Sequence, residues 1–295
     1  MSAIKPILHT ISGKGSGTGH SYYADFAAGC PLQAALKYSD GRHFMTEKSG
    51  AAVGTIAHAL WEMHFKRQLS PETPPAAVEF SNQIDEENRV EAERLFKFVR
   101  SVFPELDIFG KIVENEATHS TAVFGPTVTF KPDLITDISA KQLERLLRRN
   151  VEWTGHLGVR KPGRVMWDFK HLGRRENNHL EKALGSTQYA SYVAAYNKTN
   201  KVKIAYTVQI TVFKLKEIVI RMTVIPPPSA TLEKVASLLI NQGAQMATQS
   251  PRMVIPHEDN CFPYGSTCRY LKEGLCDRTG PTEEGLVQLK AGGFR

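Results

Sequence analysis

Asp168 and Lys170 are separated by a single residue in the apolar stretch 164–171 (RVMWDFKH). This stretch predicts a short buried strand, in which side chains alternate between two faces. Asp168 and Lys170 then share one face, and Trp167 and Phe169 share the other. A carboxylate beside an ammonium group can hold a metal ion and stabilise a developing anion. Taken alone, such a pair is more often an ordinary ion pair on an edge strand.

Acidic side chains also lie on two strands predicted earlier in the chain. Residues 112–117 predict a strand on which Glu114 and Glu116 share a face, and either glutamate could complete an acidic pocket. Residues 127–135 predict a further strand, which carries Asp133. An acid inside an apolar strand is costly unless it is paired or bound to a metal. Asp133 is therefore a second candidate site residue.

Two predicted helices add polar side chains to this set. Gly54 and His58 are one helical turn apart, so the glycine leaves room beside the imidazole. A histidine on an apolar helix face is more often a satisfied core residue than a ligand. Gln188 and Tyr192 have the same four-residue spacing on a later helix. A tyrosine on a helix face packs in the core about as often as it serves a site.

The elements that must position these residues alternate between helical and strand periodicity, which is typical of an α/β fold. Helices are predicted over 21–38 (bent at Cys30-Pro31), 51–66, 85–103, 140–149, 181–196 and 229–242, and strands over 112–117, 121–124, 127–135, 164–171, 203–213 and 217–225. The Gly-rich residues 11–20 lack the Gly-Lys-Ser/Thr ending of a phosphate loop, which excludes a helicase motor.

The positive charge of the chain is concentrated beside the predicted Asp168 strand. The net charge is +7, and residues 141–175 contain ten Lys or Arg against three acids, Glu144, Glu152 and Asp168. The net charge of this segment, +7, equals the net charge of the whole chain. A basic run is often only a solvated face, but its position beside a carboxylate site favours a nucleic-acid partner.

The cysteines and the apolar runs bear on location. No apolar run approaches the length of a membrane span, and the apolar stretch within residues 1–19 is too short for a signal peptide, so we expect a cytoplasmic protein. Disulfides are not expected in such a reducing compartment. Cys30 stands alone, whereas Cys261, Cys268 and Cys276 fall within sixteen residues and form no Cys-x-x-Cys pair.

Taken in order, these motifs resemble the PD-(D/E)XK nuclease superfamily, and more narrowly its RecB-like branch. The motifs are Gly54-x-x-x-His58, Asp133, Asp168-x-Lys170 and Gln188-x-x-x-Tyr192. Each motif is weak alone, but the ordered set is specific. The resemblance implies a restriction-endonuclease-like α/β core, with a central mixed β-sheet flanked by helices. We expect a flexible arm over 1–20, one nuclease domain over 21–276 and a tail over 277–295.

The chemistry implied by the resemblance is metal-assisted hydrolysis of phosphodiester bonds. His58, Asp133, Asp168 and the main-chain carbonyl of Phe169 would hold Mg²⁺ or Mn²⁺. Lys170 would orient a water molecule or stabilise the oxyanion, and Glu114 or Glu116 would complete the pocket. Gln188 and Tyr192 would contact the DNA backbone or brace Lys170.

An insertion separates the two aspartates of the expected site. Asp133 and Asp168 are 35 residues apart, which is longer than a simple hairpin requires. We interpret residues 138–163 as a basic insertion at the edge of the site and a candidate DNA guide. The residues expected to contact phosphates are Arg145, Arg148, Arg149, Arg160 and Lys161. The alternative is a helix that docks a partner protein.

The four cysteines are similar to those of the iron–sulfur branch of this family, which includes the AddB nuclease and the CRISPR-adaptation nucleases. The resemblance implies that Cys30, Cys261, Cys268 and Cys276 hold a 4Fe-4S cluster that joins the two ends of the domain. The intervals of six and seven residues between the late cysteines are wider than expected for that branch. Zinc, or fewer than four ligands, is therefore the alternative.

These expectations define a metal-dependent DNA nuclease, namely an exonuclease acting on DNA ends or single strands in recombination, repair or replication. The alternative from another class is a catalytically silent nucleic-acid-binding subunit held together by zinc or iron–sulfur. A sequence-specific restriction endonuclease is a third option, which the cysteines disfavour. A silent nuclease-like protein usually lacks one of the site residues, whereas His58, Asp133, Asp168 and Lys170 are all present here. Any coupled unwinding would come from a helicase or recombination partner.

Overall fold

The computed structural model describes residues 7–9, 19–40, 49–69, 73–80, 85–172, 178–214, 217–248, 269–277 and 280–291. The chain forms two compact units, each assembled from segments that are distant in the sequence. The first unit contains residues 1–11, 44–118 and 131–228, and the second contains residues 12–43, 119–130 and 229–295. None of the described helices is long and apolar enough to cross a membrane.

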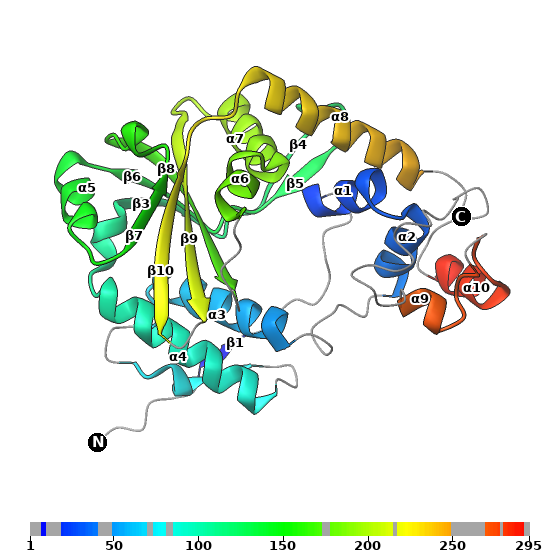
Figure 1. The fold of residues 1–295 in the computed structure, drawn as a ribbon, viewed down its shortest axis with the longest axis horizontal. Coiled ribbons are helices and arrows are strands. Elements are labelled where there is room, and N and C mark those ends of the chain that lie inside the picture. The colour runs from blue at the N-terminus through cyan, green and yellow to red at the C-terminus, as the bar shows by residue number, and fades with distance from the viewer. Residues whose placement is uncertain are drawn as a thin grey trace. The chain divides into compact units, whose positions relative to one another are not determined.

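A six-stranded mixed sheet forms the centre of the first unit (Figure 1). In spatial order its strands are β3 (Lys111–Asn115), β6 (Leu134–Ile138), β8 (Gly163–Leu172), β9 (Ile204–Lys214), β10 (Ile218–Ile225) and β7 (Glu152–Gly155). β8 runs parallel to β9 and β10 runs parallel to β7, whereas the other neighbours are antiparallel. A parallel pair needs a crossover, and α6 (His179–Leu184) and α7 (Thr187–Thr199) provide it between β8 and β9.

Helices cover both faces of this sheet (Figure 1). The helices α3 (Ser49–Phe65) and α4 (Glu86–Val102) pack on one face, and α6 and α7 contact the other. The alternation of side chains along β8 explains the division, because Trp167 and Phe169 join the apolar core with α3 and α4. Asp168 faces the opposite side, where it accepts a hydrogen bond from Tyr189 of α7.

Local sequence signals set several element boundaries in this unit. Ser139 begins α5 (Ala140–Leu147) with a capping box, in which its hydroxyl accepts from Gln142 N and the Gln142 side chain accepts from Ser139 N. Ser186 caps α7 by accepting from Tyr189 N at 3.3 Å. The described residues of this unit also form 3₁₀ helices and a small parallel pair: η1 (Pro75–Ala77), η2 (Leu106–Phe109), η3 (Leu157–Val159), β1 (Ile7–His9) and β2 (Val78–Phe80).

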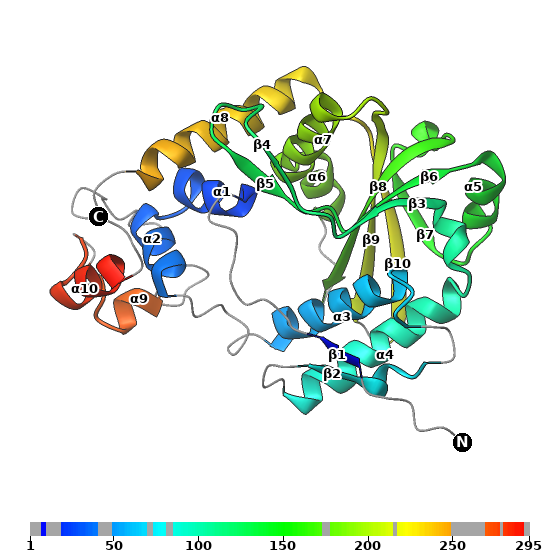
Figure 2. The same ribbon diagram turned by 180° about the vertical axis from the view of Figure 1, so that it is seen from behind.

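The described part of the second unit combines helices with a hairpin (Figure 2). Its elements are α1 (His20–Ala28), α2 (Pro31–Asp40), β4 (His119–Thr121), β5 (Val128–Phe130), α8 (Ala230–Ala247), α9 (Arg269–Lys272) and α10 (Glu283–Ala291). α1 packs along α8, and a Cβ on Gly243 would meet the Tyr23 carbonyl oxygen at 2.2 Å. Only a glycine at this position lets the two helix backbones approach so closely.

The predicted class of fold is confirmed, since a central mixed sheet lies between helices. The paired strands over 203–213 and 217–225 and the helices over 51–66 and 85–103 form close to their predicted bounds. The bend at Cys30-Pro31 is a complete break between α1 and α2. The single nuclease domain predicted over 21–276 stays a prediction, and the chain divides into the two compact units given above.

Several local predictions are wrong. The arm over 1–20 contains β1, the strand over 127–135 divides into β5 and β6, and the helix over 181–196 divides into α6 and α7. The strand divides next to Pro132, which has no N–H to donate to a neighbouring strand, and the helix divides at Gly185. β7 was not predicted, and the tail over 277–295 contains α10, whose N-terminal cap is Thr282.

Candidate active site

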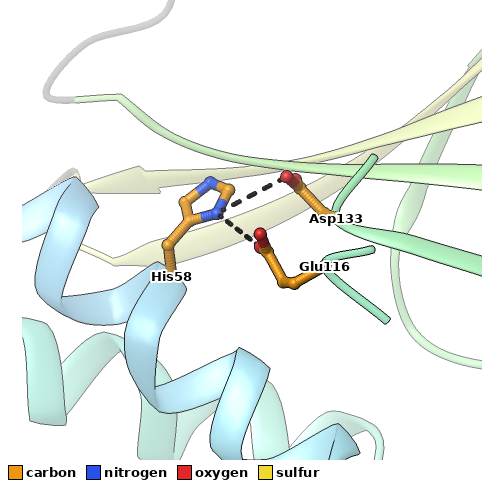
Figure 3. Close-up of side chains that lie close together, drawn as sticks. All are labelled: His58, Glu116 and Asp133. Carbon is orange, nitrogen blue, oxygen red and sulfur yellow. Dashed lines mark ion pairs between the residues drawn. The ribbon is translucent and has the colours of Figure 1, made fainter. Parts of the chain in front are cut away.

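Three side chains from separate parts of the first unit converge on one point (Figure 3). His58 projects from α3, Glu116 follows β3, and Asp133 precedes β6. His58 Nδ1 lies 3.9 Å from Glu116 Oε1 and 3.7 Å from Asp133 Oδ1. One ligand atom of each residue lies within 4.8 Å of the other two. Two carboxylate oxygens and one imidazole nitrogen suit a hard divalent ion such as Mg²⁺ or Mn²⁺, so this donor set fits the predicted metal.

Both backbone groups of Phe169 attach β8 to this cluster. The Phe169 N–H donates to Asp133 Oδ2 at 2.7 Å, and the Phe169 carbonyl accepts from His58 Nε2 at 2.5 Å. The predicted carbonyl ligand therefore lies against the predicted histidine ligand. Because Asp168 and Lys170 flank Phe169 in the chain, these two bonds also fix their backbones beside the cluster.

Glu116 is the glutamate that joins the cluster. It has a positive φ of 52°, and its N–H donates to the Asp133 carbonyl at 3.1 Å. A left-handed conformation costs a residue with a side chain on the order of 1–3 kcal/mol, and such strain is concentrated at functional sites. Glu114 pairs with Ile135 inside the sheet, and its charge acts on Tyr196. The irregularity of β3 between Ile112 and Glu114 and the turn at Glu116 end the simple alternation on which the sequence prediction rested.

The cluster shifts the pKa values of its own members. Burial tends to lower the pKa of His58, but Asp133 and Glu116 outweigh that effect and raise it to about 9. Burial raises the pKa of Asp133 to about 6, with Asp168 and Glu116 adding to the rise and His58 opposing it. In the absence of a metal ion the His58 imidazole is thus protonated on both nitrogens at neutral pH, and its positive charge balances part of the acidic charge.

Asp168 and Lys170 form the predicted pair, with Lys170 Nζ 2.9 Å from Asp168 Oδ1. Burial tends to lower the pKa of Lys170, but Asp168 and Asp133 outweigh it and raise the value above its ordinary range. Lys170 is therefore a fixed ammonium group at neutral pH. It can donate hydrogen bonds and stabilise negative charge, but it cannot accept a proton.

Of the two polar residues predicted on the later helix, Tyr192 lies within electrostatic reach of this pair. Gln188 Nε2 donates to the Tyr192 hydroxyl at 3.3 Å within α7. Burial raises the pKa of Tyr192, and the charges of Asp133, Lys170 and Asp168 also act on it. The interactions place Tyr192 near the acidic cluster, as the motif order implied.

Four residues at the site were not predicted: Lys131, His171, Tyr189 and Gln209. Lys131 Nζ lies 2.5 Å from Glu116 Oε2, and no sequence signal distinguishes it from other surface lysines. Gln209 is a polar residue within the apolar strand β9, and that exception was a usable signal. Tyr189 directly follows the recognised Gln188.

His171 is the last of these additions. Its ring centroid lies 6.3 Å from that of His58, and neither ring nitrogen has a hydrogen-bond partner among the described residues. Burial, followed by the charges of His58 and Lys170, lowers the pKa of His171 to about 3. It is therefore a neutral imidazole beside a charged one.

The basic insertion does not lie at the edge of the site. Asp133 precedes the first residue of β6, whereas α5 begins just after its last residue, Ile138. The first and last residues of a five-residue strand are roughly 13 Å apart. The predicted placement is wrong because β6 carries the chain away from Asp133 before the basic helix starts.

Acidic residues neutralise much of the basic helix. Arg145 pairs with Glu105 at 2.7 Å and with Asp107 at 2.9 Å, and Arg149 pairs with Glu105 at 2.7 Å. Arg148 pairs with Glu144 one turn away. Farther along, the Arg160 guanidinium lies 5.2 Å from the Trp153 ring centroid, and the Lys161 carbonyl accepts from Tyr206. The Arg145 and Arg149 pairs hold α5 against η2, whereas the Arg160 side chain packs on β7.

The predicted cluster cysteines are only partly described. Cys30 and Cys276 are buried in one apolar cluster of the second unit, with residues such as Phe26 and Leu32. Cys261 and Cys268 lie outside the described residues.

Comparison with known proteins identifies the family. A family model described as the PD-(D/E)XK nuclease superfamily matches residues 22–273. The chain therefore belongs to the PD-(D/E)XK nuclease superfamily, and its mixed sheet is the restriction-endonuclease-like core of that family. A solved structure from Eubacterium rectale named a "putative exonuclease" matches with 13% identity and a TM-score of 0.47, over 78% of this chain and 79% of that chain. No match is found among curated proteins.

Proposed function

We propose that this protein is a metal-dependent DNA nuclease, and specifically an exonuclease acting on DNA ends or single strands. The observation that carries the proposal is the convergence of His58, Glu116 and Asp133 within 4.8 Å, attached through Phe169 to the Asp168–Lys170 pair. The net charge of +7 favours a polyanionic substrate.

The residues proposed to hold Mg²⁺ or Mn²⁺ are His58, Glu116, Asp133, Asp168 and the Phe169 carbonyl. Such an ion, when bound, lowers the pKa of a water molecule and neutralises charge on the phosphate. The protein supplies the acidic cluster that selects a divalent cation. It also supplies the turn at Glu116, which directs a third carboxylate toward the cluster.

Lys170 is proposed to act on the phosphate by electrostatics. Its ammonium group is held by Asp168 Oδ1 and keeps its proton at neutral pH, so it donates to an oxygen that gains negative charge. Gln188 and Tyr192 are proposed to contact the DNA backbone from α7. Arg145 and Arg149 are left out of the proposed DNA contacts, because Glu105 and Asp107 pair with them.

The cysteines are proposed to hold a 4Fe-4S cluster, with zinc as the alternative. Two of the four proposed ligands, Cys30 and Cys276, are buried in one apolar cluster. Protein purified without oxygen should be brown and contain about four iron atoms per chain. A colourless protein with one zinc per chain would retire the iron–sulfur proposal and leave the nuclease site untouched.

The function is tested by digestion of end-labelled single-stranded and duplex DNA with Mn²⁺, with Mg²⁺ and with a chelator. Cleavage should need the metal and release short products from the label-bearing end, and a closed single-stranded circle should resist. Lys170→Met should lower the rate by a factor on the order of 10²–10³, because a charge-stabilising donor is lost. Lys182→Met, on an exposed part of α6, is the matched control and should cleave normally.

The results also separate the competing functions. DNA binding without cleavage by either metal would support the catalytically silent subunit instead. Cutting of the closed circle would contradict the exonuclease mode while keeping the nuclease. Full activity in Lys170→Met would contradict the assignment of the site.

A further inference from the structure

A buried hydrogen-bond network holds one oxygen of Asp168. The Tyr189 hydroxyl donates to Asp168 Oδ2 at 2.6 Å, and Gln209 Nε2 approaches the same oxygen at 3.3 Å. Gln209 Nε2 also donates to the Tyr189 hydroxyl oxygen. Asp168, Tyr189 and Gln209 are between 6% and 9% exposed, so water does not compete strongly for these bonds.

Three different elements create this arrangement. Asp168 and Gln209 are register partners on the parallel strands β8 and β9, which places their side chains on the same face of the sheet. Tyr189 lies in the first turn of α7, where the Ser186 cap fixes its backbone. The strand pairing and the helix cap together determine where the hydroxyl and the amide meet the carboxylate.

The polarity of the network is fixed by chemistry. A carboxylate oxygen accepts, so the tyrosine hydroxyl donates to Asp168 and accepts from the Gln209 amide. The Gln209 amide must then present its nitrogen, since its oxygen would face a carboxylate. Burial, and then the charge of Asp168, raises the pKa of Tyr189, which keeps the hydroxyl proton in place.

The two oxygens of Asp168 therefore have different surroundings. Oδ2 is held by Tyr189 and Gln209, and Oδ1 faces Lys170 at 2.9 Å. With one oxygen anchored, rotation of the carboxylate about its terminal bond is blocked. The second oxygen, Oδ1, then stays directed toward Lys170.

The network is a poor device for stability alone. Gln209 Oε1 is buried and has no hydrogen-bond partner among the described residues, which is costly for a side chain in a sheet. An apolar residue at this position would avoid that cost, but it would leave Asp168 with one donor fewer. A buried amide whose oxygen lacks a hydrogen-bond partner is expected where that amide contributes to a functional site.

We propose that Tyr189 and Gln209 are positioning residues, which orient Asp168 so that its Oδ1 can serve the metal-binding site. This inference rests on the proposed function, in which Asp168 is a ligand of Mn²⁺ or Mg²⁺. Residues that orient a ligand typically change metal affinity 10–100-fold when they are replaced. The two residues act on metal binding through Asp168 and do not touch the substrate.

The test compares Mn²⁺ binding, measured by electron paramagnetic resonance, in wild type, Tyr189→Phe and Gln209→Met. Each variant removes the hydrogen bonds and nearly preserves the shape of the side chain. We expect the Mn²⁺ dissociation constant to rise at least about tenfold in Tyr189→Phe and by a smaller factor in Gln209→Met. The Mn²⁺ concentration for half-maximal cleavage should rise by the same factor, with the rate at saturating Mn²⁺ largely restored.

Tyr206→Phe is the matched control. Tyr206 is equally buried, and its hydroxyl donates to the Lys161 carbonyl at 3.0 Å, away from Asp168. A merely structural role would give Tyr189→Phe and Tyr206→Phe the same result, with Mn²⁺ affinity unchanged in both. Suppose that the wild type binds Mn²⁺ and cleaves DNA, but Mn²⁺ affinity is unchanged in both Tyr189→Phe and Gln209→Met. That result would overturn the positioning role and leave the proposed function standing. A wild type that neither binds Mn²⁺ nor cleaves DNA would overturn the proposed function.

Discussion

The Nζ atom of Lys131 lies 2.5 Å from Oε2 of Glu116, the carboxylate whose other oxygen faces His58. Lys131 also lies 3.8 Å from Oε2 of Glu62, one helical turn beyond His58 on α3. Glu116 is thus shared between a built-in cation and the candidate metal site. Because Lys131 has a second carboxylate within reach, it can give up Glu116 without losing all of its charge compensation.

Replacement of Lys131 by methionine should strengthen Mn²⁺ binding, because it removes a cation that competes for Glu116. A partly exposed ion pair contributes about 0.2–1 kcal/mol, which corresponds to a gain of up to about fivefold in affinity. Titration calorimetry gives the dissociation constant. Lys97→Met is the control, since Lys97 pairs with Glu93 on α4, outside the cluster. Weaker Mn²⁺ binding in Lys131→Met would show that Lys131 supports the site instead of competing with it.

Metal binding should release a proton and strengthen as the pH rises. The pKa of His58 is raised to about 9 without metal, so at pH 7.5 the imidazole must lose its proton before a ring nitrogen can bind an ion. Glu116, Asp133, Asp168, Lys170 and His171 are the charged or titratable groups around it. Affinity should therefore fall by about tenfold per pH unit below pH 9, and more steeply below about pH 6, where Asp133 also binds a proton.

Calorimetry in buffers of different ionisation enthalpy measures that proton directly. Near pH 7.5 we expect release of about one proton per metal ion. In His58→Asn the release should largely disappear. Equal heats in all buffers for the wild type would contradict a protonated His58 in the metal-free site.

The basic helix should matter little for DNA cleavage. Arg145 and Arg149 pair with Glu105. Their helix, α5, follows the end of β6 that is remote from Asp133. A double change of both arginines to glutamine should leave the cleavage rate within about twofold and alter the salt slope of DNA binding by less than about one unit. The paired change of Gln188 and Tyr192 to alanine provides the contrast and should weaken DNA binding. A large loss from the arginine variant would restore the predicted DNA guide.

The core behind the site can be tested through Trp61. Its indole stacks on Phe169 with centroids 5.4 Å apart and meets Phe96 edge-on at 4.8 Å, and the side chain is 1% exposed. Trp61→Ala should lower the free energy of unfolding by about 3–5 kcal/mol. Trp61→Phe should cost less than half of that, because the ring remains and a buried N–H without a partner among the described residues is removed. Urea unfolding followed by circular dichroism measures both variants, and equal losses would contradict this account of the packing.

The sequence predicted the parts of the site that depend on one strand or one helix. Alternation in β8 was sufficient to place Asp168 and Lys170 on one face, and helical spacing related Gln188 to Tyr192. The order of the motifs along the chain then indicated the fold, which is confirmed by the six-stranded sheet.

The residues that the sequence missed depend on contacts between distant elements. Gln209 meets Asp168 only because β8 and β9 pair in one register, and no local pattern specifies that register. Glu116 separates from Glu114 because its φ is positive, which period-two reasoning does not foresee. The basic helix was misplaced because the direction of β6 relative to Asp133 becomes clear only in the sheet.

The central claim is that His58, Glu116 and Asp133 form a divalent-metal site, and Mn²⁺ titration of the wild type beside Asp133→Asn tests it most directly. Asp137→Asn is the control, because Asp137 lies on β6, four residues after Asp133, and pairs with Arg164. We expect Mn²⁺ to bind wild type and Asp137→Asn alike, and Asp133→Asn to bind at least about tenfold more weakly. Equal Mn²⁺ binding by all three proteins would contradict the claim.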